Sequence, residues 1–510
     1  MSTLGETLAN SQTVQAHRPW TRNVVDAELW RTLASQLADG RWTLLGLWGD
    51  RPSGTPAQVH MALLDGQARE VAVATYVAAG ESFPSVGRYH PPAIRLERTI
   101  RDLFGIEPDG LPDQRPWLDH GRWGTRHPLG AATEAPDSLL PYTFLPSEGE
   151  GLHQIPVGPV HAGIIEPGHF RFTANGETVV RLEERLGYVH KGIESLMTGA
   201  PLERAARIAG RTSGDSTVAY ALAFARAAEA ALGIDVPARA HWLRALMAEL
   251  ERLANHFGDI GAICNDAAFA LMLAHCGVLR ERVLRTAGAC FGHRLMMDCI
   301  VPGGVKTDLV ASGAGQIRNL VDTARQAFPP LVELYDNTTS LQDRTVSTGI
   351  TRPALVRQYG TGGYVGRASG REFDARRHLS YAPYDGLHFD VPVLNEGDVN
   401  ARIWIRIREV EQSLALIGQL LDGLPPSETV RVPIDGTGHP AEGMAVVEGF
   451  RGDILVWIRL DGEAHVERCH LRDPSWFQWP LLEAAIEGNI VADFPLCNKS
   501  FNCSYSGHDL

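Results

Sequence analysis

Three helical patterns follow one another in the middle of the chain, and they constrain its fold more than any other feature. Residues 219–232 are rich in alanine, carry an apolar stripe at helical spacing and are stopped by Gly233. Pro237 suits the first turn of the next helix, ARAHWLRALMAELERLANHFGDIGAI, and a third pattern covers about 267–292. Because successive amphipathic helices bury their apolar stripes against one another, the sequence predicts a helical bundle.

Strand patterns flank these helices on both sides. Before them, WTLLGLWGD, EVAVATYVA, HFRFTANGE and TVVRLEERLGYVH have the apolar, β-branched character of strands. After them, RVPIDG, GMAVVEGFRGDILVWIRLDG and AHVERCHLRD return to strand character, with glycine turns between them. The expected fold class is therefore α+β: a small N-terminal α/β domain, then a helical-bundle domain with flanking small β-sheets.

The length of 510 residues exceeds what one hydrophobic core usually supports, so two or more domains are expected. We predict a first domain over 1–125, in which a helical pattern follows FPSVGRYHPP and ends at Gly105. Residues 126–150 are polar and contain prolines, which is the composition of a linker. The second domain is predicted over 151–510.

Composition and charge exclude several classes of function. The formal net charge of -13 offers no general attraction to nucleic acid or to anionic lipid. The chain has no apolar run of about 18 residues that would indicate a membrane span, and its N-terminus lacks the features of a signal peptide. The seven cysteines form no C-x-x-C pair, so we expect no disulfide framework, zinc site or cubane cluster. Most of them are interpreted as small core residues.

Four segments resemble one family in their order and spacing. LERTIRDLFGIEPDG (96–110) is similar to the signature of the small hydrophilic subunit of complex I. Three others resemble the large subunit of formate-hydrogenlyase-type nickel–iron hydrogenases and of complex I: IPVGPVHAGIIEPGHFRF with RLGYVHKGIESL, GTGGYVGRASGREFDARRHLSYAPYD, and the tail that begins RDPSWFQWP. The resemblance covers nearly all of the chain beyond residue 80 and implies that the two subunits are fused.

The resemblance implies a large subunit of a membrane-associated, complex I-like, energy-converting hydrogenase-related oxidoreductase, which couples electron transfer to ion translocation. It implies docking onto a small iron–sulfur subunit and onto integral membrane antiporter-like subunits. Iron–sulfur clusters are then expected in the partner subunit, and no cofactor is expected in this chain. We expect it to lie peripherally on the cytoplasmic side of the inner (cell) membrane.

All four metal-ligand positions of the family are substituted. Nickel–iron hydrogenases hold their metals with thiolates from two C-x-x-C pairs, because soft sulfur donors suit these ions. The first pair lies in the pattern R-x-C-G-x-C-x-x-x-H, which residues 207–216 match. Here the two cysteines are replaced by Ala209 and Thr212, and the histidine is replaced by Ser216. In the tail, the second pair becomes Ser504 and Gly507. A hydrogen-activating centre is therefore not expected.

The quinone-binding residues of complex I are missing as well. The place of its histidine falls near Glu166 or Pro167, and that of its tyrosine falls on Gly210. A quinone reductase subunit of the NADH-quinone oxidoreductase type remains an alternative, as does a non-catalytic structural scaffold.

Ionisable residues remain at positions near the family's cavity. Glu166 resembles the glutamate that carries protons from the hydrogenase metals, which as a buried carboxylate would have a raised pKa; the alternative is a surface turn before Pro167. We predict a catalytic set of Glu166, Arg207 and His169. The predicted cavity-lining residues are His161, Ala209, Gly210, Thr212, Ser216, Arg367, Asp374, Arg376, Ser504, Gly507 and His508. The alternatives are core histidines and an internal ion-pair network.

Two further groups have open interpretations. Glu249, Arg252 and His256 share one helix face, where they form a proton relay, a partner contact or a plain ion pair. Cys497, Cys503 and His508 are a weaker candidate for another metal site, since three scattered donors lack a fixed pair.

Overall fold

A five-stranded sheet forms the N-terminal part of the molecule in a computed structural model, which describes residues 3–134, 141–161, 165–426 and 429–510. The sheet order is β1 (Gln12–Thr13), β3 (Thr21–Val25), β6 (Glu70–Ala78), β5 (Ala57–Asp65) and β4 (Thr43–Asp50). Only the β3–β6 pair in it is parallel. It is accompanied by α1 (Leu4–Leu8), α2 (Ala27–Ala38), α3 (Ile94–Phe104) and the short strands β7 (Ser82–Pro84) and β8 (Glu107–Asp109).

The predicted elements of this part are confirmed. WTLLGLWGD forms β4 and EVAVATYVA forms β6. The predicted helix is α3, and Gly105 ends it in the left-handed conformation at φ 70°. α3 packs against β4, and its Arg95 pairs directly with Glu184 and Glu483 farther along the chain.

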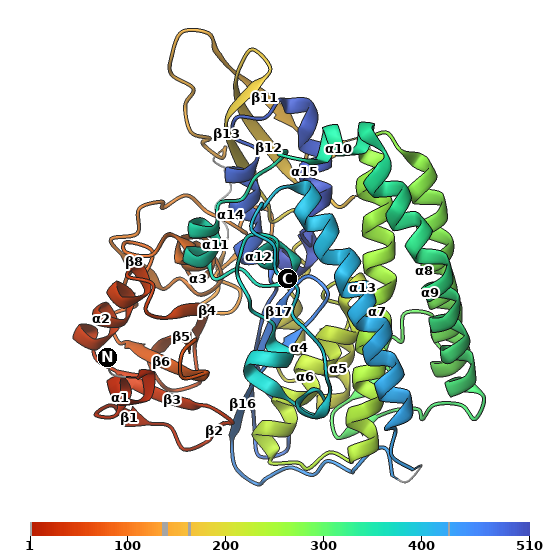
Figure 1. Ribbon diagram of the computed structural model, residues 1–510. Coiled ribbons are helices and arrows are strands. Elements are labelled where there is room, and N and C mark those ends of the chain that lie inside the picture. Colours follow the sequence, from red (N-terminus) through yellow and green to blue (C-terminus); the bar gives the residue numbers. More distant parts are fainter. Residues whose placement is uncertain (1–2, 135–140, 162–164, 427–428) are drawn as a thin grey trace.

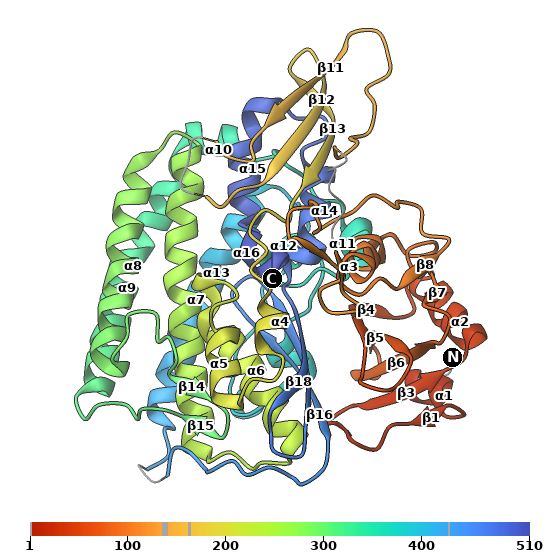
Figure 2. The same ribbon diagram turned by 180° about the vertical axis from the view of Figure 1, so that it is seen from behind.

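Four long helices lie side by side in both views (Figures 1 and 2). They are α7 (Ala238–Asp266), α8 (Ala270–Phe291), α9 (Gly313–Asn337) and α13 (Val399–Asp422). α7 and α9 each contact both α8 and α13, which closes a bundle. α7 and α8 confirm the predicted helices, whereas α9 and α13 were not predicted; α9 contains Pro329 and Pro330, which interrupt a helical pattern.

A second sheet supports the shorter helix α6 (Thr217–Leu232), the first of the three helices that the sequence predicts. Its order is β18 (Val466–Arg472), β17 (Asp453–Leu460), β16 (Ala441–Glu448) and β2 (His17–Arg18). β2 comes from the N-terminal segment and pairs in parallel with β16. The prediction of a strand in RVPIDG is wrong: among its residues only an isolated bridge from Arg431 to Gly304 is formed, and Pro433 cannot donate to a ladder.

A third, antiparallel sheet projects from the molecule (Figure 1) and comprises β11 (Leu152–Val157), β12 (His169–Asn175) and β13 (Thr178–Arg185). The region predicted as a linker contains β10 (Thr133–Glu134), which pairs with β9 (Thr125–Arg126), while its residues 135–140 lie outside the described part. The remaining elements are β14 (Ile300–Val301), β15 (Gly304–Val305), α4 (Ile193–Met197), α5 (Leu202–Ala209), α10 (Thr339–Thr345), α11 (Pro353–Tyr359), α12 (Gly363–Arg367), α14 (Ser475–Ala485), α15 (Phe494–Phe501) and α16 (Tyr505–Asp509).

The hydrophobic core is shared between the N-terminal part and the rest of the chain. One cluster joins Trp48 and Val73 to α6, the bundle and β16–β18, and another joins Trp30 and Phe104 to Trp479 in the tail. Trp476 and Trp479 anchor α14 in this core. The molecule is thus an α+β structure. Its described helices include none with the length and apolar character needed to cross a bilayer.

Candidate functional site

The two segments that replace the family's metal-binding motifs meet in the interior. The Ser213 and Ser504 hydroxyl oxygens lie 2.9 Å apart and share a hydrogen bond. Lys191 joins the same two segments, because its Nζ donates to the carbonyl of Thr212 at 2.8 Å and to that of Ser506 at 3.5 Å. The two motifs, which are far apart in the sequence, therefore lie next to each other in the fold.

The four former ligand positions are filled by packed or hydrogen-bonded groups. Ala209 and Thr212 are fully buried, and Ser504 caps α16 by accepting from the amide of Gly507 at 2.9 Å. The amide of Ser504 donates in turn to the hydroxyl of Ser475. A Cβ at Gly507 would lie 2.4 Å from Asp473 Oδ2, so this position has no room for a side chain.

Asp473 is itself held in place from two sides. The Tyr220 hydroxyl donates to Asp473 Oδ2 at 2.6 Å, and the amide of Ser475 donates to Oδ1 at 2.8 Å. Burial, together with the neighbouring Asp473 charge, raises the pKa of Tyr220, so the phenol remains a donor. The carboxylate therefore occupies the space next to the second ligand position.

A partly buried ion pair lies next to this site, where Asp215 accepts from the Ser213 hydroxyl. Arg451 donates from Nη1 to Asp215 Oδ1 at 2.7 Å and to the Ser216 hydroxyl at 3.2 Å. Burial opposes the charge on Asp215, but the Arg451 guanidinium outweighs it and lowers the pKa of Asp215 to about 2.

The residues present do not fit a nickel–iron pair. Alanine and glycine carry no donor atom, and the hydroxyl of Ser504 is engaged in hydrogen bonds. Hydroxyl oxygens are also poor substitutes for bridging thiolates. Within the described residues, no group of three histidine, cysteine or acidic side chains is placed to hold a metal ion.

The tail residues considered for another metal site have different partners. His508 stacks on Trp476 with ring centroids 3.9 Å apart, and its Nδ1 lies 2.8 Å from Asp509 Oδ1. Its Nε2 accepts from the indole of Trp117 at 3.2 Å, so it is a core histidine that joins the N-terminal part to the tail. All seven cysteines are buried and free, and burial raises the pKa of the Cys503 thiol.

The predicted catalytic set has no common buried centre. Glu166 is exposed, not buried, and accepts from the amide of Ser506 at 3.0 Å. Arg207 is exposed in the last turn of α5, near Asp298, whose pKa is lowered chiefly by the hydrogen bond from Arg211. The expectation of a buried Glu166 carboxylate is thus wrong, because the turn before Pro167 lies at the surface.

The two candidate histidines of the neighbouring strand segment also differ in environment. His169 is buried, its Nδ1 lies 3.1 Å from the carbonyl of Gly158, and burial lowers its pKa. His161 is half-buried next to residues 162–164, which lie outside the described part. Gly210 receives a hydrogen bond from the Thr217 hydroxyl on its carbonyl at 2.7 Å, so it has a backbone role only.

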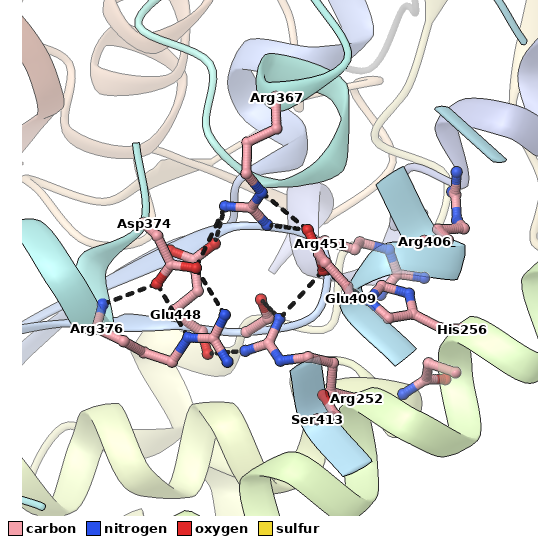
Figure 3. Close-up of polar contacts among 12 residues, drawn as sticks. Arg252, His256, Arg367, Asp374, Arg376, Arg406, Glu409, Ser413, Glu448 and Arg451 are labelled. Carbon is pink, nitrogen blue, oxygen red and sulfur yellow. Dashed lines mark hydrogen bonds and ion pairs between the residues drawn. The ribbon is translucent and has the colours of Figure 1, made fainter. Parts of the chain in front are cut away.

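The charged residues predicted near the cavity form a buried ion-pair network instead (Figure 3). Arg367 contacts Glu409 at 2.7 Å, Glu448 at 2.9 Å and Asp374 at 3.6 Å. Arg376 contacts Asp374 at 2.6 Å. This is the alternative that the sequence left open, and it is confirmed for Arg367, Asp374 and Arg376.

The Glu249, Arg252 and His256 face of α7 belongs to the same network. Glu249 accepts from Arg376 at 2.8 Å and pairs with Arg252 at 3.4 Å, while His256 Nε2 lies 2.7 Å from Glu409. The helix-face ion pair is confirmed, but it is buried. Sequence reasoning missed Glu409, Glu448, Tyr220, Asp473 and Arg451, since nothing in their local patterns marks them as buried partners.

The fold and the substituted site together define a class: a hydrogenase-type large subunit fused to a complex I-type small domain, without the thiolate ligands. Two family profiles match the chain. Residues 266–437 and 434–509 match the respiratory-chain NADH dehydrogenase 49 Kd subunit, and residues 24–137 match its 30 Kd subunit.

Individual relatives extend this match. The chain is 31% identical to hydrogenase-4 component G of Escherichia coli, over 88% of this chain and 78% of that protein. It is 32% identical to the carbon monoxide-induced hydrogenase of Rhodospirillum rubrum, over 69% of this chain and 97% of that protein. A solved chain from a membrane-bound sulfane sulfur reductase, an archaeal respiratory membrane complex, superposes with a TM-score of 0.67 at 26% identity and covers 71% of this chain and 99% of that chain. The protein belongs to the family of hydrogenase and complex I large subunits.

Proposed function

We propose that this chain is the large subunit of a membrane-associated, complex I-like, hydrogenase-related oxidoreductase complex that couples electron transfer to ion translocation without a nickel–iron site. One observation carries the proposal: the large-subunit fold is retained, while Ser213, Ser504 and Asp473 form hydrogen bonds at and beside the positions that the resemblance assigns to the metal ligands. The relatives that are hydrogenase components and NADH-quinone oxidoreductase subunits support the class of complex.

The proposal includes a division of labour between subunits. This chain binds no redox cofactor, and a small iron–sulfur subunit carries the electrons past it. Integral membrane antiporter-like subunits anchor the complex, with this chain peripheral on the cytoplasmic side of the cell membrane. The relatives from hydrogenase and NADH-quinone oxidoreductase complexes and the chain from a respiratory membrane complex support attachment through partners.

Purification of the tagged full chain from its native membranes tests this function. Mass spectrometry of the mild-detergent extract should find an iron–sulfur subunit and integral membrane subunits in stoichiometric amounts. Elemental analysis should find iron from the partner but no stoichiometric nickel, and hydrogen oxidation should be absent. Recovery of the chain alone from the soluble fraction, or one nickel per chain, would contradict the proposal.

A second candidate, a non-catalytic scaffold subunit, is favoured by the closed packing at the four ligand positions. The two candidates differ in how the complex responds to Arg207→Ala. If a small molecule such as a quinone reacts beside this chain, the exposed Arg207 is available to it, and turnover should fall without loss of assembly. A scaffold predicts unchanged turnover, with loss only when residues at subunit contacts are replaced.

A further inference from the structure

The centre of the network in Figure 3 is a set of four carboxylates and three guanidinium groups that form ion pairs with one another. Its acids are Glu249, Asp374, Glu409 and Glu448, and its bases are Arg252, Arg367 and Arg376. Each of these side chains is 4% exposed or less. Since an uncompensated buried charge is costly, such a cluster favours the uptake of one further positive charge.

Of these four carboxylates, Glu448 has the fewest contacts with guanidinium groups. Glu409 receives both Nε and Nη2 of Arg367, at 2.8 and 2.7 Å, as well as His256. Asp374 receives two hydrogen bonds from Arg376. Among the described residues, Glu448 has one guanidinium contact, from Arg367 Nη1 at 2.9 Å, and its other oxygen accepts only from the amide of Ala375.

The charged and titratable groups around Glu448 come from several elements, and the Tyr381 hydroxyl accepts from its backbone amide at 3.2 Å. Arg367 reaches it from α12, Asp374 from the following loop, Arg252 from α7 and Asp453 from β17. Arg252 donates to the Glu448 carbonyl at 2.9 Å, and Asp453 pairs with Arg472. The remaining cation is Arg371, which acts on Glu448 electrostatically while its guanidinium lies 4.5 Å from the centre of the Phe373 ring.

We propose that Glu448 is a proton-binding site, at which one exchangeable proton neutralises the excess carboxylate of this buried cluster. The proton comes from solvent and binds a carboxyl oxygen of Glu448, so the interior of the large-subunit domain changes charge by one unit without any cofactor in this chain. The inference does not depend on the proposed function. In a redox complex, such a site offsets the charge of an electron that arrives nearby.

The electrostatics of the site agree with this assignment. Burial, with the Asp374 charge second, raises the pKa of Glu448 to about 7. His256 is the other group that could hold the proton, but burial lowers its pKa. Although burial opposes ionisation of Glu409, Arg367 and His256 keep the pKa of Glu409 well below its usual range.

Infrared difference spectroscopy of the full chain tests the proposal, because a protonated carboxyl absorbs apart from a carboxylate. Spectra of the wild type and of Glu448→Gln are compared from about pH 5 to about pH 9. The wild type should show one additional protonated carboxyl that disappears as the pH rises through about 7. Arg371→Met removes a positive charge without breaking a contact to Glu448, and it should shift the midpoint to higher pH.

The matched control is Glu442→Gln on the same strand, because Glu442 has its own guanidinium, with both oxygens 2.8 Å from Arg22. The infrared titration curve of the Glu442→Gln variant should equal that of the wild type. A Glu448→Gln spectrum identical to the wild type at every pH would overturn the assignment. If that variant does not fold, an unchanged midpoint in Arg371→Met overturns it equally.

The stability of the fold gives an independent readout with a defined sign. Because the folded pKa of Glu448 is raised, its contribution to stability is complete below the usual glutamate pKa and is lost as the pH rises through about 7. The unfolding temperature of the wild type should therefore fall over this range more steeply than that of Glu448→Gln. Equal slopes would contradict proton binding at Glu448.

Discussion

At the scale of single residues, the positions that the family resemblance assigns to the metal ligands lie in a packed polar core. The decisive residue is Gly507, which stands where a ligand cysteine would be and faces the Asp473 carboxylate. Tyr220 and the amide of Ser475 hold that carboxylate, so it cannot move aside freely. The loss of thiolates is therefore accompanied by new groups that use the space, which would also hinder a simple return of the ligands.

We predict that Gly507→Ala destabilises the protein by about 1–3 kcal/mol, because the new methyl group overlaps Asp473 Oδ2. Thermal unfolding of the full chain measures the effect. Combined with Asp473→Ala, the same substitution should cost much less, since the overlapping atom is gone.

Gly418→Ala on α13 is the matched control, because a Cβ there meets nothing within 4 Å. It should leave the unfolding temperature unchanged or raise it. A rise would correspond to a gain of about 0.4–1 kcal/mol in the free energy of unfolding. Equal effects of the two alanine substitutions would show that Asp473 does not restrict position 507.

At the scale of elements, buried ion pairs determine how the helices are arranged. Arg367 on α12 holds Glu409 of α13 and Glu448 of β16, and Arg252 of α7 donates to the end of the same strand. Such networks contribute little net stability when complete, but they are costly to break because the remaining charges stay buried.

We predict that Arg367→Met destabilises the fold by about 3–5 kcal/mol, since Glu409 and Glu448 lose their shared guanidinium. The control is Arg318→Met, which removes an exposed ion pair with Asp422 at the bundle surface and should cost no more than about 1 kcal/mol. Chemical denaturation compares the two variants. Similar midpoints would mean that the buried network tolerates the loss of its central cation.

At the scale of the whole molecule, the N-terminal part and the remainder share their cores. β2 extends the sheet of β16, Arg22 pairs with Glu442, and Trp117 bonds His508. Figures 1 and 2 show the N-terminal part lying directly against the C-terminal elements. The contact is therefore formed by the domains themselves, while the boundary at 125 and the linker over 126–150 remain predictions.

We predict that residues 1–134 and 141–510, produced as two polypeptides, co-purify as one complex, because their contacts do not require the connection between them. Size-exclusion chromatography of the pair measures the association. Removal of residues 1–20 from the first polypeptide should weaken it, since β2 is lost. Elution of the first polypeptide alone would contradict this account.

The sequence by itself determined the features that have local causes. Glycine and proline mark the ends of α3, α6 and α7, and apolar, β-branched segments mark β4, β6 and β16–β18. The order of four motifs identified the family, and their substituted cysteines predicted a site without thiolates.

Only the tertiary structure decided which charges are buried and what replaced the metals. Glu166 resembles a buried proton carrier but lies at the surface, whereas Glu448 and Asp473, which no motif marks, are enclosed. Burial and pairing depend on segments hundreds of residues apart, such as Ser213 and Ser504. Local sequence patterns cannot specify these contacts, because the pKa of a carboxyl and the space beside a glycine are properties of its neighbours in space.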